Sequence, residues 1–389
     1  MKPGISLTKL LTMIAATGFI QGCTAVKTVV HNFADLDDHT IFSNRTIEPP
    51  ATPAALRSLA RVPGFIASLQ VPDESGALRP LDDYLDATHT AAFVVMRDDR
   101  IVYERYSRGF GEHTRFNSFS IAKSIMATLF GMAVAEGRIS SLDATVADYR
   151  PEFAGTAYGG IRLHHLLAMT SGVGDAPSLL PGRAQFYYGD DLRDVVAHGV
   201  SEATPGERWR YSEADVQMLG FVLEAAVGKS LSAYLAEKVW KPVGMESEAL
   251  WALDRAGGSE KAFCCISARA RDFARFGRLF LDNGRVNGAQ VVPAEWANPA
   301  SFPGVRTLDR YMHRHLWWFP EGSEGDYYAY GHNGQYVYVN PAARTVIVKF
   351  SETNRQDPVG MFRAVSAALK PAARVAELDR LDAPAIASR

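Results

Sequence analysis

Ser120 and Lys123 are the residues of this 389-residue chain whose types and spacing most directly suggest chemistry. They stand at the start of "SIAKSIMATLFGMAVAEG", whose apolar pattern predicts a helix that ends near Gly137. Residues three apart in a first turn share a face, so the amine can reach the hydroxyl. A serine becomes nucleophilic when a neighbour takes its proton, and a desolvated lysine can do so. The same spacing also occurs at Ser6 and Lys9, so it is not sufficient by itself.

Two later segments carry residues that would complete such a site. Tyr211 precedes Ser212, a good N-cap residue for the amphipathic stretch that follows, so its phenol is expected at the mouth of a helix. His332, Asn333 and Gly334 precede "QYVYVN", which alternates like a strand, and a glycine there allows close approach of a substrate to the backbone. We therefore expect a hydroxyl, an amine and a phenol to converge beside a strand.

In this order along the chain, these segments resemble the motifs of the serine β-lactamase and penicillin-binding protein superfamily. The likeness covers most of the chain and is greatest to class C β-lactamases, related esterases and 6-aminohexanoate-dimer hydrolases. The segments that carry it are "FNSFSIAKS", "HHLLAMTSGV", "PGERWRYS", "CCISARARDFARFGRLFLDNGRVNGAQVVP" and "GHNGQYVYV".

The resemblance implies a serine hydrolase that acts on a small ester or amide without a cofactor. Ser120 would attack the carbonyl and form an acyl-enzyme, while Lys123 and Tyr211 would share the proton transfers. Which of the two is the base stays open. The backbone N–H groups of Ser120 and Gln335 would hold the oxyanion.

Two departures from the family pattern bear on the substrate. His332-Asn333-Gly334 stands where most members have Lys-Thr-Gly, and a histidine near pH 7 is only partly charged. Glu213 stands where Tyr-x-Asn has its amide, so it either repels an anionic acyl donor or faces solvent as an acid of the first turn. Both changes favour an esterase or amidase. A weak β-lactamase, a D-alanyl-D-alanine carboxypeptidase and a low-turnover lipoprotein that binds penicillin or peptidoglycan remain as alternatives.

Four aromatic residues are secondary candidates. Tyr187 and Tyr188 are expected in a loop, where they either overhang the substrate or pack on the surface. Trp317 and Trp318 are interpreted as sheet packing, with one of them able to line the pocket.

The remaining reactive side chains are given structural interpretations. Arg271, Asp272 and Arg275 have helical spacing, which favours an ion-pair network over catalysis. Cys264 and Cys265 are adjacent, and adjacent residues rarely meet disulfide geometry. Because no cysteine or histidine cluster has the spacing of metal ligands, we expect no metal.

The beginning of the chain has the features of an export signal. Residues 1–22 contain two lysines and then an apolar run that is too short to span a bilayer, which predicts a signal peptide. Ile20-Gln21-Gly22-Cys23 resembles a bacterial lipoprotein cleavage site apart from its large Gln21, so we expect lipidation of Cys23. The resulting expectation is an exported, periplasmic, membrane-anchored lipoprotein of a Gram-negative-type bacterium, with residues 23–52 as a tether.

Composition excludes some partners. The net charge of −2 arises from 41 basic and 43 acidic residues without long runs of one sign, so we expect no nucleic acid partner. Contact with a membrane is expected only through the lipid anchor, and the oligomeric state is left open.

Residues 53–389 are predicted to form one α/β (α+β) domain of β-lactamase-like fold. A first helix is expected at 54–61 and a hairpin at 91–96 and 101–106, and strand patterns return after residue 310. This distribution predicts a central antiparallel sheet built from both ends of the chain and flanked by helices, with an all-helical insertion at about 142–245. A last helix is expected in "PVGMFRAVSAALK".

Overall fold

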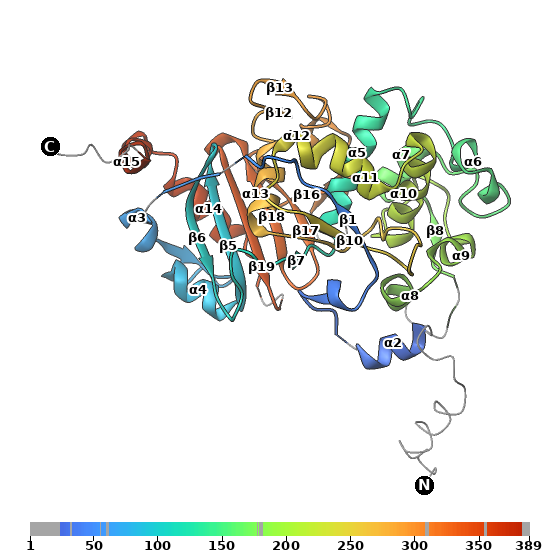
Figure 1. Cartoon of the computed structure of the whole chain (residues 1–389), viewed down its shortest axis with the longest axis horizontal. Coiled ribbons are helices and arrows are strands. Elements are labelled where there is room, and N and C mark those ends of the chain that lie inside the picture. Colours follow the sequence, from blue (N-terminus) through green and yellow to red (C-terminus); the bar gives the residue numbers. More distant parts are fainter. Residues whose placement is uncertain are drawn as a thin grey trace, which may run out of the picture.

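The structure, a computed structural model, describes residues 24–382 except 32, 55, 60, 61, 177, 179–181, 308–310, 354 and 355. The expected signal peptide and Cys23 lie outside the described residues. At the centre is a nine-stranded sheet with helices on both faces (Figure 1). Its strands, in spatial order, are β14 (Val305–Arg306), β15 (Met312–Arg314), β16 (Trp317–Phe319), β17 (Tyr327–Gly331), β18 (Gln335–Asn340), β19 (Thr345–Ser351), β5 (Thr90–Arg97), β6 (Arg100–Tyr106) and β2 (Arg57–Ser58).

The sheet joins the two ends of the chain, as predicted. The expected hairpin is confirmed, because β5 and β6 pair antiparallel. On its other edge β5 pairs antiparallel with β19, with Val94 opposite Val348. The remaining late strands continue outward from β19 as antiparallel neighbours.

Both faces of the sheet are covered, which explains why β5 is buried along nearly its whole length. Alternate residues of β5 belong to two separate hydrophobic clusters, one on each face. Helices α5 (Ile121–Ala135) and α13 (Ala270–Arg278) pack on one face. Helices α4 (Leu81–Ala87) and α14 (Val359–Ala368) cover the other, and α14 confirms the expected last helix.

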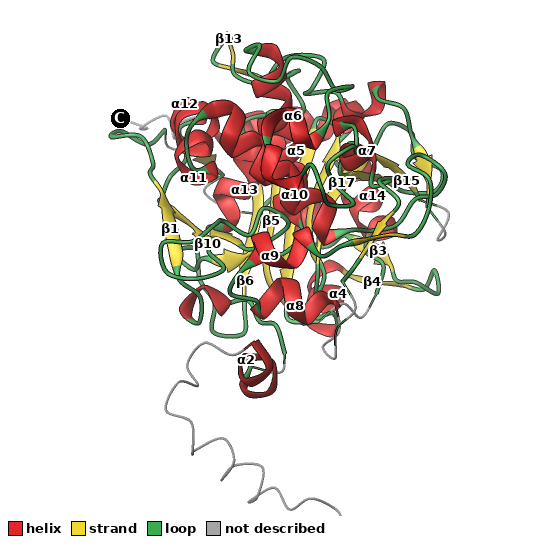
Figure 2. Cartoon of the chain, turned by 90° about the vertical axis from the view of Figure 1, so that its right-hand side faces the viewer, coloured by secondary structure: helices red, strands yellow, loops and turns green. Residues whose placement is uncertain are grey.

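A helical block lies beside the sheet, at the right of Figure 1 and toward the viewer in Figure 2. The prediction that it is all-helical is wrong in one detail, because two short strands, β8 (Val173–Gly174) and β9 (Val200–Ser201), pair within it. Its helices are α6 (Val146–Tyr149), α7 (Leu163–Ala168), α8 (Gly182–Tyr188), α9 (Leu192–Ala197), α10 (Glu213–Val227), α11 (Leu231–Leu235), a π-helical turn (Ala236–Trp240) and α12 (Lys241–Val243).

A second sheet of four strands holds the nucleophile segment. Its spatial order is β1 (Asn44–Ile47), β10 (Ala249–Ala252), β11 (Ile266–Ala268) and β7 (Phe116–Asn117). The chain passes from β7 directly toward Ser120 and α5.

Two predictions for the N-terminal region are corrected. The expected tether contains α2 (Thr24–Val30), which contacts α8, and β1, which pairs with β10. The helix expected at 54–61 is wrong, since Arg57 and Ser58 form β2 and pair parallel with β6. The open edge of β6 offers this Pro-flanked segment backbone partners that an isolated short helix would lack.

The remaining elements are peripheral. In the described part of the chain no single helix is long and apolar enough to cross a membrane; α10 and Leu231–Val243 reach that length only as a pair bent by 71°. The peripheral elements are α3 (Gly64–Ala67), β3 (Gln70–Pro72), β4 (Leu78–Pro80), β12 (Arg285–Val286), β13 (Ala289–Gln290) and α15 (Ala372–Asp382).

Candidate active site

Ser120 lies at the N-cap position of α5, where the turn after β7 delivers it to the edge of a cleft. The turn is held from both sides: Ser118 N donates to Ile266 O (2.8 Å), and Ile266 N donates to Ser118 Oγ (3.0 Å). Phe119 has a φ of 43°, an uncommon conformation for a residue with a side chain. The nucleophile candidate therefore stands on a strained, well-supported turn.

Lys123 is one turn into α5 and reaches Ser120, as the spacing predicts. Its Nζ donates to Ser120 Oγ and to Phe263 O, each at 2.8 Å, and the residue is only 2% exposed. Burial lowers the pKa of Lys123 to about 8, while Glu213 acts in the opposite direction. At pH 7 about a tenth of the amine is therefore unprotonated and able to accept a proton.

Tyr211 brings its phenol to the same place from the helical block. The Tyr211 ring centroid is 4.8 Å from Lys123 Nζ, and the phenol interacts with the Ser120 hydroxyl. Burial raises the pKa of Tyr211 well above its usual value, so the phenol stays protonated in the resting site. The three predicted side chains do converge.

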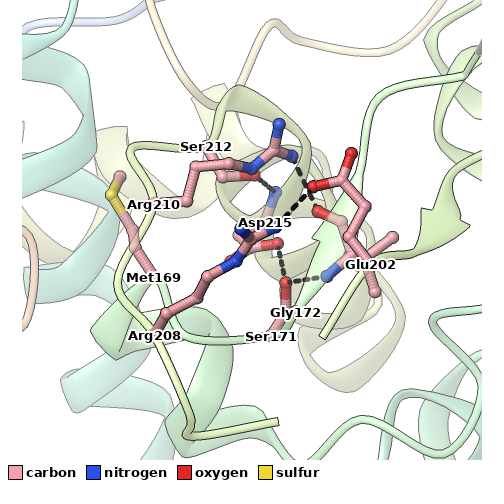
Figure 3. A pocket seen from close by; sticks show the side chains of 9 residues that line it. Met169, Ser171, Gly172, Glu202, Arg208, Arg210, Ser212 and Asp215 are labelled. Carbon is pink, nitrogen blue, oxygen red and sulfur yellow. Dashed lines mark hydrogen bonds and ion pairs between the residues drawn. The ribbon is translucent and has the colours of Figure 1, made fainter. Parts of the chain in front are cut away.

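The position of Tyr211 follows from the start of α10. Ser212 caps this helix, as predicted, by accepting a hydrogen bond from Asp215 N (3.1 Å). Behind the cap, the Asp215 carboxylate accepts hydrogen bonds from Ser171 Oγ (2.7 Å) and Tyr158 OH (2.9 Å). Figure 3 shows the small cavity around this network, in which Ser171, Ser212 and Asp215 face one another.

Asp215 is a residue that the sequence interpretation missed. It is fully enclosed, and burial raises its pKa to about 6, partly opposed by its hydrogen bonds. Its other oxygen, Oδ2, has no hydrogen-bond partner among the described residues. In the sequence, the Ser-x-x-Asp spacing of Ser212 and Asp215 is the one signal that could have indicated a role for Asp215 at the N-terminus of α10.

The cleft beside Ser120 has a volume of about 600 Å³ and is mostly aromatic. Its charged lining consists of Arg183 on α8 and Glu213 on α10. Glu213 is thus among the residues that line the cleft. Its aromatic lining consists of Phe33, Phe119, Tyr187, Tyr188, Trp209, Tyr211, Phe263, Trp318 and Tyr330.

Tyr187 and Tyr188, which were expected to bind substrate from a loop, do line the cleft, but they lie in a helix. Tyr187 and Tyr188 belong to α8, so the prediction of a loop is wrong. Tyr187 OH donates to Asp38 (2.5 Å), and Tyr188 OH donates to His31 O. The two phenols therefore fasten the N-terminal segment to the cleft wall. The sequence pattern was too short to distinguish a helix of two turns from a loop.

The segment His332-Asn333-Gly334 forms the turn between β17 and β18. His332 lines the cleft. Two effects lower the pKa of its ring: chiefly its partial burial and, to a smaller extent, the positive charge of the nearby Arg183, so the ring is mostly neutral near pH 7. Asn333 Nδ2 donates to Ala34 O (2.9 Å), and Gly334 has a φ of 83°, which suits glycine.

The expectation that Gln335 contributes to the oxyanion site fits the structure less well. Gln335 is 0% exposed and is not among the residues that line the cleft. Its side chain links Ser351 to the hairpin turn by donating to His332 O (2.8 Å) and accepting from Ser351 N (2.9 Å). The hairpin closes immediately before Gln335, which leaves His332 at the cleft and Gln335 inside the sheet.

Two further predictions concern structural residues. The ion-pair interpretation is confirmed for two of the three residues: Arg271 binds Glu104 (2.6 Å), and Arg275 lies 3.2 Å from Glu246. Asp272 instead accepts a hydrogen bond from Glu246 N (2.6 Å). The disulfide interpretation is wrong, because Cys264 and Cys265 are bonded to each other, with an S–S distance of 1.98 Å. The sequence gives no signal for this pairing beyond the adjacency of the two cysteines.

The tryptophan pair behaves as interpreted. Trp317 is buried in the core, whereas Trp318 lines the cleft and stacks near Tyr211, with 5.9 Å between the ring centroids.

With this geometry established, comparison with known proteins places the chain in a family. Residues 80–370 match the family model described as Beta-lactamase. The chain is 26% identical over 326 residues to the 6-aminohexanoate-dimer hydrolase of Paenarthrobacter ureafaciens, covering 78% of this chain and 80% of that protein. It is 34% identical over 181 residues to esterase EstB of Burkholderia gladioli, covering 40% and 45% of the two chains.

A solved structure gives the same result. The putative 6-aminohexanoate-dimer hydrolase from Bacillus anthracis superposes with a TM-score of 0.76 at 25% identity, covering 88% of this chain and 93% of that chain. The family model spans most of the chain and includes Ser120, Lys123, Tyr211 and His332. The chain belongs to the Beta-lactamase family.

Proposed function

We propose that the protein is a serine hydrolase that cleaves a small ester or amide through an acyl-enzyme on Ser120. The observation that carries this proposal is the buried Lys123 amine, 2.8 Å from Ser120 Oγ, with a neutral carbonyl as its other partner. A carboxylate in that place would keep the lysine protonated, whereas a carbonyl leaves its pKa near 8. The amine can therefore act as a base at physiological pH.

Acylation then follows from the positions of the three side chains. Ser120 Oγ attacks the substrate carbonyl carbon as its proton passes to Lys123. The protonated Tyr211 phenol, beside both groups, is suited to donate a proton to the leaving alcohol or amine and to recover it from Lys123. Water subsequently attacks the acyl-enzyme and releases the acid.

For the oxyanion we propose the backbone N–H groups of Ser120 and His332 in place of Ser120 and Gln335. In the described part of the chain, neither the Ser120 nor the His332 N–H donates to another protein group. The close packing at Gly331 supports this pair of donors. A Cβ at this position would lie 2.3 Å from Ser118 O, so the end of the hairpin that carries His332 packs directly against the turn that carries Ser120. Donors fixed before reaction stabilise a transition state by about 3 kcal/mol each.

The cleft favours neutral or apolar acyl groups. Its lining is largely aromatic, and the neutral His332 ring offers a weaker grip on a carboxylate than the lysine that most family members have at this motif. We therefore propose esterase or amidase activity ahead of β-lactam or D-alanyl-D-alanine hydrolysis.

The test is a panel of p-nitrophenyl acetate, p-nitrophenyl butyrate, short amides and nitrocefin on one preparation. Steady ester or amide turnover that vanishes in Ser120→Ala, together with an acyl adduct on Ser120 by mass spectrometry, is the expected result. A single stoichiometric burst without turnover would instead identify a binding protein, and faster turnover of nitrocefin than of the esters would identify a β-lactamase.

We also propose that the chain is exported and anchored through a lipid on Cys23. Helix α2 follows at once and ends with the exposed apolar side chains of Val29 (77%) and Val30 (67%). Phe33 (84% exposed), three residues beyond the helix, lines the cleft. A Cys23→Ser variant should move from the membrane fraction to the soluble fraction, and unchanged fractionation would refute the anchor.

A further inference from the structure

The Cys264–Cys265 disulfide occupies a place next to the reacting groups. It lies in the connection between β10 and β11, and both cysteines are buried, at 3% and 2% exposure. Cys264 also forms part of the cleft wall. A bond between adjacent residues closes a small ring that includes the intervening peptide, so it restricts the backbone locally instead of joining distant parts of the fold.

The backbone groups flanking this ring hold the nucleophile and its base. Phe263 O, one residue before the ring, accepts the hydrogen bond from Lys123 Nζ. Cys265 N, within it, donates to Phe119 O (3.2 Å), the residue immediately before Ser120. On the far side, Cys264 O accepts from Trp251 Nε1 (3.1 Å), which fixes the ring to the second sheet.

The ring also stabilises an unusual backbone conformation. Cys265 has a φ of 73°, a region that residues with side chains rarely adopt. With two free thiols, nothing covalent would keep the 264–265 peptide in this arrangement, and the chain could relax toward negative φ. The rotated bond is Cys265 N–Cα, and Phe263 O and the Cys265 N–H both belong to the chain on its N-terminal side. The rotation would therefore reorient the two groups together relative to Cys265 Cα.

Phe263 O determines how the Lys123 amine is oriented, because the other hydrogen-bond partner of Lys123 Nζ is Ser120 Oγ, the group with which it reacts. A neutral amine has one lone pair and two N–H groups, and only the lone pair can accept the Ser120 proton. When an N–H stays on Phe263 O, the amine is turned so that its lone pair can face Ser120 Oγ. If that carbonyl moves, the lone pair of Lys123 is no longer oriented toward Ser120 Oγ, and the amine becomes less buried.

We propose that the Cys264–Cys265 disulfide is a positioning element for Lys123, holding the Phe263 carbonyl and the Ser120 turn in the geometry that proton transfer needs. This inference rests on the proposed function. Its consequence is that reduction to two thiols lowers kcat more than it changes KM and moves the acidic limb of the pH–rate profile to higher pH.

The first experiment uses the full-length Cys23→Ser chain, in which Cys264 and Cys265 are the remaining cysteines. Thiol titration should find no free thiol before reduction and two afterward. The reductant is dithiothreitol, which delivers two electrons and two protons to the disulfide and becomes its own cyclic disulfide. We expect kcat for p-nitrophenyl butyrate to fall at least about tenfold on reduction, the scale of a misdirected catalytic group. Free thiols before reduction would overturn the proposal.

Two matched variants separate the ring from the chemistry of sulfur. Cys264→Ser/Cys265→Ser should show the reduced kcat and no further response to dithiothreitol. Cys264→Ser/Cys265→Gly should recover part of the lost rate, because glycine adopts a φ near 73° without steric cost. Rates equal to the oxidised parent in both variants, with unchanged pH profiles, would overturn the proposal.

A readout that needs no turnover completes the test. In protein labelled with ¹³C at lysine Cε, the Lys123 resonance, assigned by its loss in Lys123→Ala, should titrate near pH 8 when oxidised and at higher pH when reduced. Identical titrations in the two states would overturn the positioning role. If no ester or amide is turned over in any state, the proposed function fails, and this titration still decides the inference.

Discussion

The neutral fraction of Lys123 should control the rate near pH 7, and two cleft residues of opposite charge should move it in opposite directions. With a pKa of about 8, about a tenth of the amine is neutral at pH 7. Glu213 raises this pKa by favouring the protonated amine, and Arg183 lowers it. Glu213→Gln should therefore speed acylation at pH 7, and Arg183→Gln should slow it.

The size of the first effect has a ceiling. Because the neutral fraction cannot exceed one, removing the Glu213 charge can raise kcat/KM at pH 7 by at most about tenfold through this route. At pH 10 the amine is neutral in each protein. If the Glu213 and Arg183 charges affect the rate only through the pKa of Lys123, kcat/KM of the variants and of the parent should be equal at this pH. The assay is kcat/KM for p-nitrophenyl butyrate from pH 5.5 to 10, with acidic limbs fitted separately.

The comparison between the two variants is the decisive part. Both residues line the same cleft, so a general disturbance of substrate binding would change both rates in the same direction at every pH. Acidic limbs that coincide with the parent, or that shift the same way in both variants, would refute the assignment of Lys123 as the titrating base.

Three further predictions test the site and its supports. Lys123→Ala and Tyr211→Phe should each lower acyl transfer at least about a hundredfold in single-turnover measurements, the scale of lost proton transfer, and a near-normal rate in either would remove that residue from the mechanism. Asp215→Asn keeps an acceptor for Ser171 and Tyr158 but cannot ionise. Since burial raises the Asp215 pKa from 3.8 to about 6, the stability of the parent relative to this variant is greatest below about pH 4 and falls by about 3 kcal/mol as the pH rises through 6. Urea unfolding at several pH values measures this difference, and parallel curves of stability against pH for the two proteins would contradict it. Gly331→Ala places a Cβ 2.3 Å from Ser118 O, so it should lower both kcat and the melting temperature, at a cost of about 1 to 3 kcal/mol, and wild-type values for both would show that the hairpin end has room to move.

Local patterns predicted much of the site, because its residues sit at helix starts and strand ends. The Ser120 to Lys123 spacing fixes one helical turn, and Ser212 fixes where α10 begins, so both placements were accessible from neighbouring residues. The strong alternation at residues 91–106 likewise identified β5 and β6.

The parts that sequence reasoning missed depend on contacts between distant segments. Arg57 and Ser58 become a strand only because β6 leaves an edge open to them. Gln335 appeared suitable for the oxyanion because it follows Gly334, but the closing of the hairpin places it inside the sheet and leaves His332 at the cleft. The bond between the adjacent cysteines is accompanied by a positive φ at Cys265 in the loop between β10 and β11, a combination that no local rule predicts.

The pairing of β5 with β19 has a consequence for how the enzyme is made. Phe93 lies opposite Lys349, so the middle of the sheet joins residues about 250 positions apart. During synthesis the hairpin of β5 and β6 emerges about 240 residues before β19, its neighbour on the other edge. The central sheet therefore stays incomplete until Thr345–Ser351 has been made, and a product that ends before residue 345 would lack the strand that pairs with the first hairpin.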